Sequence, residues 1–431
     1  MPNSESSVKK DIVVGAVGSG SKQSSRLLYF ANYNSSVNFR YYREMGDCLR
    51  GRGKFQEARI AWERAAELEP NDIDIHLDLG ALLAENGELE AAISHFEKAV
   101  KLDSDNIDAN YFLGLAHFRL EHFRQALKFW KHCFKCKAED LDEVGLRMCL
   151  AEAYRALGRF KKAIFQLYEI LGQSPYNLDA YNVLSMVFFE MGEEVLAMEV
   201  LQKAIAYGPD FYRSHLNLGV IYFSRGAIDM AIHEFRKACK CNPLDADSFY
   251  NLARSLSVRG DIDGACVALY RSIELDSTQL DGLSLLGNLE LVRGRYNEAR
   301  SHFAKILETD PDNVDILCAM AEAEHLLYHY QEAETYLQKA LKLEPKNPMV
   351  HYSLALLYRD QSKMLSKSLS HMRMAVELAE ETPELQLLYG DILADSGKMG
   401  KAMEAWGRAV ELDPQLADDV NSRLKSRNQR E

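Results

Sequence analysis

The chain contains 431 residues, of which 51 are Lys or Arg and 64 are Asp or Glu, so its formal net charge is −13. Hydrophobic residues make up 47% and charged residues 27%, which is ordinary for a folded protein and excludes wholesale disorder. No apolar run approaches the ~20 residues that span a bilayer, so we expect no membrane insertion. The acidic balance argues against a nucleic-acid partner, because phosphate binding needs a basic surface. Eight scattered cysteines favour a reducing compartment and predict a cytoplasmic protein.

Residues 1–38 are rich in Ser and Gly and are predicted to form a mobile tail. Within the tail, residues 11–23 are similar to a phosphate-binding Walker A loop, but Ser21 stands where that loop needs Lys, and Gln23 replaces its hydroxyl residue. We therefore expect no nucleotide or other cofactor. Apolar residues at 27–33 are compatible with a short helix that caps the first folded unit.

From residue 39 onward, alanine recurs with a period of 34 residues, with a shift of three after the third repeat and of one before the tenth. The eleven positions of this series are Ala58, Ala92, Ala126, Ala163, Ala197, Ala231, Ala265, Ala299, Ala333, Ser368 and Ala402. A small residue lies twelve positions before nearly every residue of this series. Gly lies five positions before eight members of the series, and Pro lies twelve positions after seven of them. This pattern predicts two helices of roughly 13 residues per unit, which cross closely at the small residues, are joined by a Gly turn and end before the Pro.

The pattern resembles the tetratricopeptide repeat, which has a 34-residue period. The resemblance is clearest in the sixth unit, which contains Leu218, Gly219, Tyr222, Gly226, Ala231, Phe235, Ala238 and Pro243. Eleven such units cover 39–416, at 39–72, 73–106, 107–140, 144–177, 178–211, 212–245, 246–279, 280–313, 314–347, 348–382 and 383–416. The resemblance implies an all-α, right-handed superhelical solenoid of tandem helix-turn-helix repeats.

Two irregularities interrupt the series, and a further helix is predicted after it. Residues 141–143 are extra and predict a bend between the third and fourth units. An extra residue near 362–363, together with Ser368, predicts a shifted or poorly packed second helix in the tenth unit. After the last repeat, Leu416, Val420 and Leu424 form an i, i+4, i+8 stripe, so 417–431 is predicted to be a capping helix.

Several His and Cys residues are candidate metal ligands or catalytic groups. Cys133 and Cys136 form a Cys-x-x-Cys pair beside His132, but Cys133 occupies a packing position that other units fill with Ala, and no fourth ligand is evident. Cys239 and Cys241 are interpreted in the same way, as core residues. His325 and His329 have helical i, i+4 spacing near Glu322 but lack a His-Glu-x-x-His motif. We expect no metal site and no catalytic residues, and the segments outside the repeats are too short for a catalytic domain.

Resemblance to the family implies that positions 5, 9 and 12 of each first helix line a concave groove. In the third to sixth units these positions are Tyr111, Leu115, Phe118, Met148, Glu152, Arg155, Asn182, Met186, Phe189, Leu216, Val220 and Phe223, and the seventh unit adds Tyr250 and Arg254. Nine of the first twelve are apolar, whereas the next units are more polar. Such a surface is typical of partner binding, but partial burial between neighbouring first helices would produce the same pattern.

These observations favour a non-catalytic scaffold or adaptor that binds a peptide or helix of a partner protein in the groove. An alternative is an assembly platform that self-associates into a homo-oligomer. RNA binding by a helical-repeat protein is opposed by the net charge, and an enzyme would need an active site that the sequence does not contain.

Overall fold

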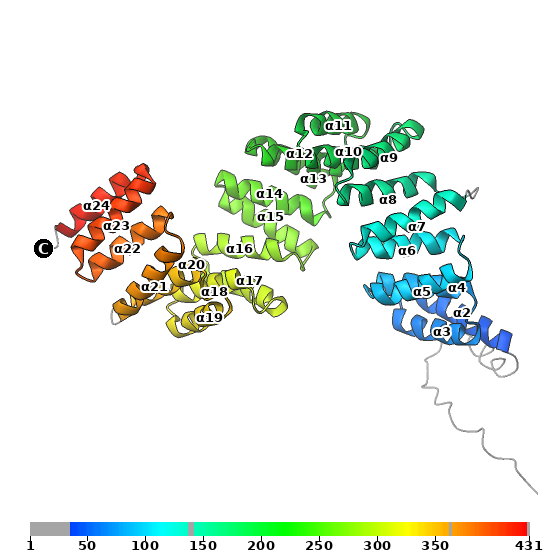
Figure 1. Cartoon of the computed structure of the whole chain (residues 1–431), viewed down its shortest axis with the longest axis horizontal. Coiled ribbons are helices and arrows are strands. Elements are labelled where there is room, and N and C mark those ends of the chain that lie inside the picture. The colour runs from blue at the N-terminus through cyan, green and yellow to red at the C-terminus, as the bar shows by residue number, and fades with distance from the viewer. Residues whose placement is uncertain (1–34, 137–141, 362–363, 429–431) are drawn as a thin grey trace, which may run out of the picture. The chain divides into compact units, whose positions relative to one another are not determined.

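The structure is a computed structural model that describes residues 35–136, 142–361 and 364–428 (Figure 1). Residues 1–34 of the predicted tail, with its short helix at 27–33, and residues 137–141, 362–363 and 429–431 lie outside the described residues. Residues 35–38 were predicted to belong to the tail, but they form the start of a helix that begins at Ser35, one turn before the first repeat. The described part is all-helical and contains no strand, as the sequence predicted. No helix in it is long and apolar enough to cross a membrane.

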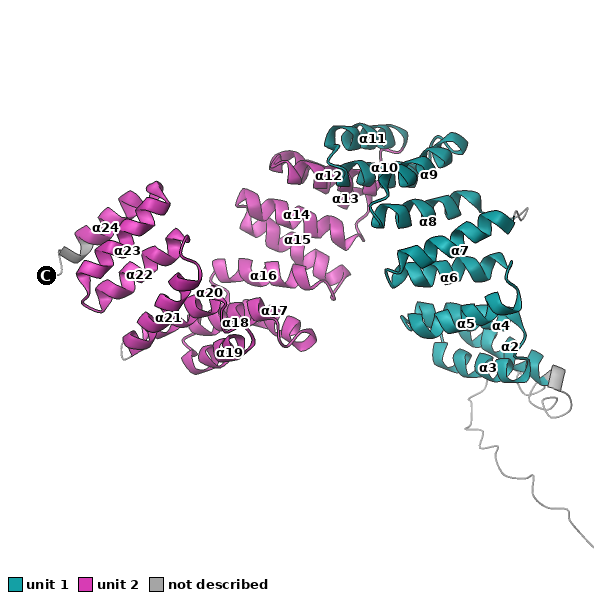
Figure 2. Cartoon of the chain, in the orientation of Figure 1, with its two compact units in different colours: residues 1–207 teal, residues 208–431 magenta. Residues whose placement is uncertain are grey.

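The chain forms two compact units, Met1–Tyr207 and Gly208–Glu431 (Figure 2). In the first unit the first helices of the repeats are α2 (Ser35–Gly51), α4 (Ile73–Glu85), α6 (Ile107–Arg119), α8 (Glu143–Ala156) and α10 (Leu178–Glu190). Their second helices are α3 (Phe55–Leu68), α5 (Leu89–Leu102), α7 (Phe123–Cys136), α9 (Phe160–Gln173) and α11 (Glu194–Tyr207). Each second helix from α3 to α9 packs against its own first helix and against the next one along the chain.

The second unit repeats this arrangement. Its first helices are α12 (Tyr212–Ser224), α14 (Ala246–Arg259), α16 (Leu280–Val292), α18 (Val314–Leu326), α20 (Pro348–Asp360) and α22 (Pro383–Asp395). Its second helices are α13 (Ile228–Cys241), α15 (Ile262–Leu275), α17 (Tyr296–Thr309), α19 (Tyr330–Leu343), α21 (Leu365–Leu378) and α23 (Met399–Leu412). A single turn, η2 (Pro414–Leu416), leads into α24 (Ala417–Asn428), and Val420 of that helix packs in a cluster with Trp406.

Local sequence explains where the helices begin. An Asp or Asn stands just before many first helices and accepts a hydrogen bond from the backbone N–H three residues later. These capping residues are Asp72, Asn106, Asp142, Asn177, Asp245, Asn313 and Asn347, of which the last accepts from the residue two positions on. Each satisfies an N–H that the helix itself leaves without a partner.

The turn between the two helices of a repeat needs a left-handed residue. All eight glycines predicted at this turn have positive φ, among them Gly226 at 73°. Glycine adopts this conformation without a steric penalty because it lacks a Cβ. Two repeats place a larger residue at the same position, Glu121 with φ 59° and Tyr328 with φ 64°. These two turns are therefore strained relative to the others.

The two helices of a repeat approach most closely at the small residue of the first helix. A Cβ added to Gly219 would lie 2.6 Å from the ring of Phe235 on the partner helix. The periodic small residues and alanines predict that the small residue faces the Ala of the second helix, but the three atoms nearest to this added Cβ all belong to the Phe235 ring. The crossing distance in such a repeat is therefore set by an aromatic ring lying on a glycine.

A polar side chain at the fourth position of a repeat ties the preceding connection to the first helix. Each donates to the carbonyl oxygen six residues earlier, at distances from 2.9 to 3.4 Å, in the pairs His76–Pro70, Asn110–Ser104, Tyr181–Pro175, His215–Pro209, His351–Pro345 and Gln386–Glu380. These bonds satisfy carbonyl groups that neither helix can pair. They help to fix one repeat against the next.

The tenth repeat is better packed than its sequence suggested. Its second helix, α21, begins one residue later than the period predicts, which agrees with the extra residue. However, Ser368 is fully buried and its hydroxyl donates to the carbonyl oxygen of Ala355 at 2.7 Å. The hydrogen bond allows a hydroxyl to occupy a position filled by Ala elsewhere.

Candidate partner-binding surface

In the first unit, the predicted stripe lies on α6, α8 and α10. Seven of its predicted members are half-buried: Tyr111, Leu115, Phe118, Met148, Arg155, Met186 and Phe189. Asn182 differs from the expectation, because it is only 4% exposed and donates to the carbonyl oxygen of Leu178 at 2.7 Å. Asn182 therefore stabilises its own helix and offers little surface to a ligand. The remaining side chains form a partly exposed apolar surface.

Contacts within this stripe show that its residues also serve packing. The ring centroid of Phe118 lies 5.7 Å from that of Trp130 on α7, so it contacts the second helix of its own repeat. The hydroxyl of Tyr111 is 3.8 Å from the sulfur of Cys149 on α8, and burial raises the pKa of Tyr111 to about 12. The interpretation of partial burial between first helices thus holds for Tyr111, which contacts α8, whereas Phe118 is covered by the second helix of its own repeat. Neither residue is fully enclosed.

Arg155 takes part in an ion pair between repeats that the sequence pattern did not predict. Its guanidinium donates to Glu190 of α10 at 2.5 Å and to Glu152 at 2.9 Å. The same link, from position 12 of one first helix to position 13 of the next, recurs in the pairs Arg50–Glu85, His325–Asp360 and Arg359–Asp395 at 2.6, 2.8 and 2.9 Å. A basic residue followed by an acidic one about 35 positions later was the signal for these pairs.

In the second unit the stripe lies on α12 and α14. Arg254 is exposed, and its guanidinium lies 4.8 Å from the ring centroid of Phe223 and 5.7 Å from that of Tyr250. Leu216 and Val220 are half-buried beside them and pack against the buried core. A guanidinium lying on two rings keeps donors free for a carboxylate or carbonyl group while the rings supply apolar contact. This arrangement can bind a peptide that has both kinds of group.

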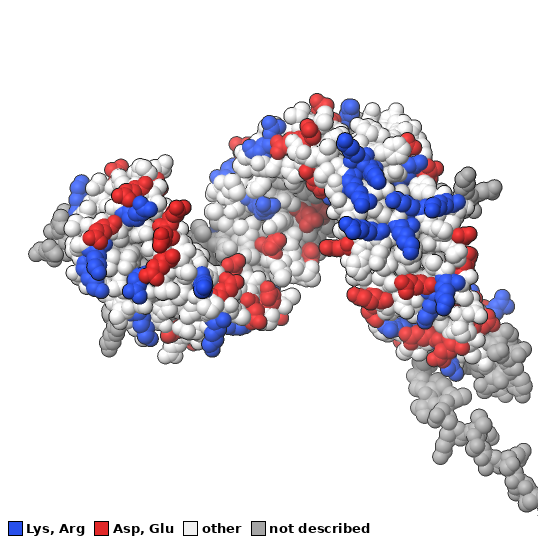
Figure 3. Space-filling model, in the orientation of Figure 1, with Lys and Arg blue, Asp and Glu red and all other residues white. Residues whose placement is uncertain are grey.

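Basic side chains gather over α7 to α9 in the first unit (Figure 3). Helix α7 carries Arg124, Lys128, Lys131 and Lys135 and has no acidic residue, whereas every other second helix has at least one. The ammonium groups of Lys131 and Lys162 lie 5.5 and 5.8 Å from the ring centroid of Tyr154. The chain is acidic overall, so this row of cations is a local exception.

The other candidate groups of the sequence are engaged in the fold. Cys133 and Cys239 are buried, and burial raises their pKa values to about 11 and about 12, so both remain neutral thiols near neutral pH. His325 pairs with Asp360, as described above, and His329 is hydrogen-bonded to Glu324 at 2.7 Å. Residues 11–23 lie outside the described part.

The fold and its 34-residue units define an α-helical repeat protein. Family models described as "Tetratricopeptide repeat" match residues 196–246, 234–266, 290–357 and 383–416, and one described as "TPR repeat" matches 46–87 and 82–121. Together the matches cover more than half of the chain. The chain belongs to the tetratricopeptide repeat family, and this membership supports a protein-interaction scaffold in general terms.

Comparison with solved structures gives similar repeat proteins at low identity. The chain is similar to a chain of the APC/C hetero-tetramer Cut9-Hcn1, with TM-score 0.45, 15% identity and coverage of 94% of this chain and 99% of that one. It is also similar to yeast Tom70, with TM-score 0.40, 15% identity and coverage of 92% and 97%. Pseudomonas aeruginosa pilF gives TM-score 0.43, 19% identity and coverage of 52% and 99%. A comparison with curated proteins gave no match.

Proposed function

We propose that the protein is a non-catalytic scaffold that binds a peptide or helix of a partner protein along the first helices of its repeats. The observation that carries this proposal is the partly exposed apolar stripe on α6, α8 and α10, whose members recur at positions 5, 9 and 12. Partly exposed Leu, Met and Phe side chains have apolar area left to bury against a partner, and this burial would favour association. The partner is a protein rather than nucleic acid, and eight free thiols favour the cytoplasm.

Charge substitution at Phe189 or Phe223 tests the proposal. The wild-type chain is used to select peptides from a displayed library, and their affinities are then measured for Phe189→Asp and Phe223→Asp. We expect binding to fall by at least about tenfold, because an unpaired carboxylate would lie in the apolar contact. Since both rings are half-buried, we also expect a modest loss of stability, about 1–2 kcal/mol.

Leu218→Asp is the packing control, because Leu218 is 5% exposed on the same helix as Phe223. It should lower the melting temperature far more than either Phe variant does. If the Phe variants melt as early as Leu218→Asp, the stripe belongs to the core. If they melt close to wild type and bind the peptides normally, the partner uses another surface.

Self-association is the second candidate, and the basic row on α7 favours it. These cations could pair with acidic surface on a second copy, because the rest of the chain carries an excess of Asp and Glu. Sedimentation velocity at increasing protein concentration should then show a larger species that dissociates at high salt and in Lys128→Glu. A monomer at all concentrations would exclude this alternative and leave peptide binding untouched.

A further inference from the structure

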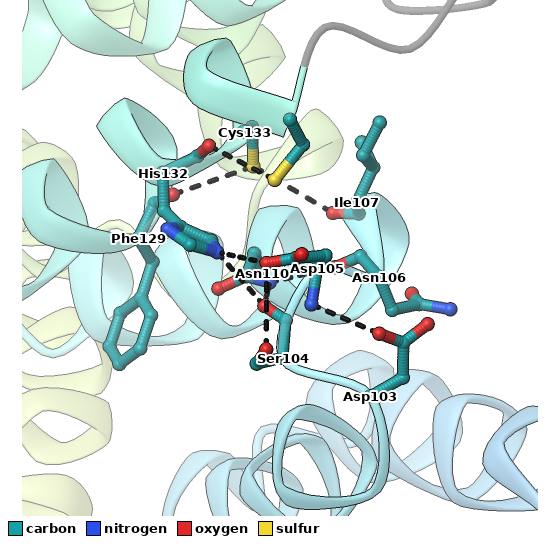
Figure 4. A network of polar contacts seen from close by, with 10 residues as sticks. Asp103, Ser104, Asp105, Asn106, Ile107, Asn110, Phe129, His132 and Cys133 are labelled. Carbon is teal, nitrogen blue, oxygen red and sulfur yellow. Dashed lines mark hydrogen bonds and ion pairs between the residues drawn. The ribbon is translucent and has the colours of Figure 1, made fainter.

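Three potential metal ligands of different types converge at the end of α7 (Figure 4). Asp105 lies in the connection between α5 and α6, and His132 and Cys136 are one turn apart near the end of α7. One ligand atom from each of the three residues lies within 4.8 Å of the other two. His132 Nε2 and Asp105 Oδ1 are 3.1 Å apart.

This set differs from the Cys-x-x-Cys pair that the sequence presents. Cys133 points into the core, where its thiol lies 3.4 Å from the carbonyl oxygen of Phe129. Asp105 takes its place in the cluster, from a connection 27 residues earlier than His132. The sequence did not predict Asp105 beside the Cys-x-x-Cys pair, because only the fold brings this carboxylate to His132 and Cys136.

Hydrogen bonds hold the three side chains in this arrangement. His132 Nε2 donates to the carbonyl oxygen of Ser104 at 3.0 Å, and Asn110 donates to the same oxygen at 2.9 Å. The backbone N–H of Asp105 donates to Asp103 at 3.0 Å, which fixes the connection. The thiol of Cys136 donates to the carbonyl oxygen of His132 at 3.3 Å. A set of ligands held in advance loses less conformational entropy when it binds an ion.

We propose that Asp105, His132 and Cys136 form a binding site for a zinc-type divalent transition-metal ion. Imidazole nitrogen, carboxylate oxygen and thiolate sulfur are the ligands that zinc takes in proteins, at bond lengths of about 2.0–2.3 Å. Tetrahedral ligands at these lengths are separated by roughly 3.2–3.8 Å, so the three atoms need only small movements to bind one ion. Water or the Ser104 carbonyl oxygen completes the coordination.

Binding changes the protonation of two of these ligands. The thiol of Cys136 loses its proton to solvent as the metal–sulfur bond forms. His132 gives up the hydrogen bond from Nε2 and carries its proton on Nδ1, so that the Nε2 lone pair faces the metal. Thiolate and carboxylate together balance the charge of a divalent ion. The bound ion would join the α5–α6 connection to the end of α7 and so stabilise the third repeat.

Cobalt and zinc titrations test the site in the full-length protein. Every variant carries Cys48→Ser, because Cys48 is an exposed thiol that could bind metal on its own. We expect one equivalent of Co²⁺ to give a near-ultraviolet thiolate-to-cobalt absorption band, and Zn²⁺ to abolish it by displacement. Zn²⁺ should also raise the melting temperature, since it binds the folded state preferentially.

Substitution of each ligand separates this site from general thiol binding. Cys136→Ser, His132→Gln and Asp105→Asn should each lower the Co²⁺ affinity at least about tenfold. Asp105 is exposed, so Asp105→Asn should leave the melting temperature of the metal-free protein unchanged. Cys241→Ser is the matched control: Cys241 has the same position in the sixth repeat, where Lys237 replaces the His, and this variant should bind Co²⁺ like its parent.

Three results would overturn the proposal. The first is a parent protein that gives no cobalt–thiolate band at one equivalent. The second is a band that survives Cys136→Ser with unchanged affinity. The third is a loss of Co²⁺ affinity in Cys241→Ser as large as that in Cys136→Ser, because the absorption band would then come from thiols in general. None of these results bears on peptide binding by the first helices.

Discussion

Gly219→Ala tests how the two helices of a repeat are spaced. Each glycine at the close crossing lies against an aromatic ring of the second helix. In the other five repeats the sequence has Ala or Ser at the glycine position and Leu or Met at the position of the ring. The glycine pairs are Gly46–Trp62, Gly80–Phe96, Gly114–Trp130, Gly219–Phe235, Gly287–Phe303 and Gly390–Trp406, in each of which an added Cβ would lie 2.3 to 2.6 Å from the ring. The other five are Ala151–Leu167, Ser185–Leu201, Ala253–Leu269, Ala321–Leu337 and Ala355–Met372.

The size of the expected effect follows from the geometry at Gly219. A methyl group there would lie 2.6 Å from the ring of Phe235, which is fully buried. Overpacking of this kind costs about 1–3 kcal/mol. The higher helix propensity of Ala returns about 1 kcal/mol. We therefore expect Gly219→Ala to lower the stability of the sixth repeat by about 1 kcal/mol.

Gly407→Ala is the matched control, because Gly407 lies in the middle of α23 and nothing lies within 4 Å of its added Cβ. There the propensity gain should act alone and stabilise the helix by up to about 1 kcal/mol. The double variant Gly219→Ala/Phe235→Leu should be more stable than Phe235→Leu alone, because its residue pair then matches Ala253 and Leu269 of the next repeat.

Urea unfolding combined with hydrogen exchange of amides in α12 and α13 measures these effects. Residue-level exchange is needed because repeat arrays unfold in parts, so one midpoint does not describe the whole chain. The reasoning is refuted if Gly219→Ala is as stable as Gly407→Ala. It is also refuted if the stability lost by the double variant is no smaller than the sum of the losses in Gly219→Ala and Phe235→Leu.

Three further predictions follow from strain, burial and exposure. Tyr328→Gly should stabilise its turn by about 1 kcal/mol in thermal melts, because Tyr328 has φ 64°. Gly226→Ala should destabilise the corresponding turn, because Gly226 also has a positive φ. Burial, together with nearby Lys and His, lowers the pKa of His95 from 6.5 to about 4, so the unfolded chain binds a proton that the folded chain rejects. The free energy of unfolding should therefore fall by about 1–2 kcal/mol as the pH is lowered from 6.5 to about 4. In His95→Gln the free energy of unfolding should depend less steeply on pH over this range. Alkylation followed by mass spectrometry at pH 8 should modify exposed Cys48 and spare buried Cys133, whose pKa is raised to about 11.

The sequence alone determined the repeat unit and its local structure. Periodic small residues predicted the helix pairs, and the eight predicted turn glycines all have positive φ, as Gly260 shows with 86°. These features could be read because each depends on interactions within about one repeat: apolar periodicity, helix caps and the steric freedom of glycine. The Gly–aromatic pairing was also present in the sequence, at a spacing of sixteen residues, but its meaning appeared only when the rings were seen on the glycines.

Tertiary structure decided which side chains of different repeats meet. Asp105 reaches His132, and Arg155 reaches Glu190, only because neighbouring helices have particular rotations and spacings. Asn182 shares its position in the repeat with partly exposed Tyr111 and yet is buried. A periodic pattern fixes which face of a helix is apolar, but a few degrees of rotation decide whether one residue on the edge of that face is covered. Exposure and partner choice at such edges therefore depend on the packed helices, which local sequence does not specify.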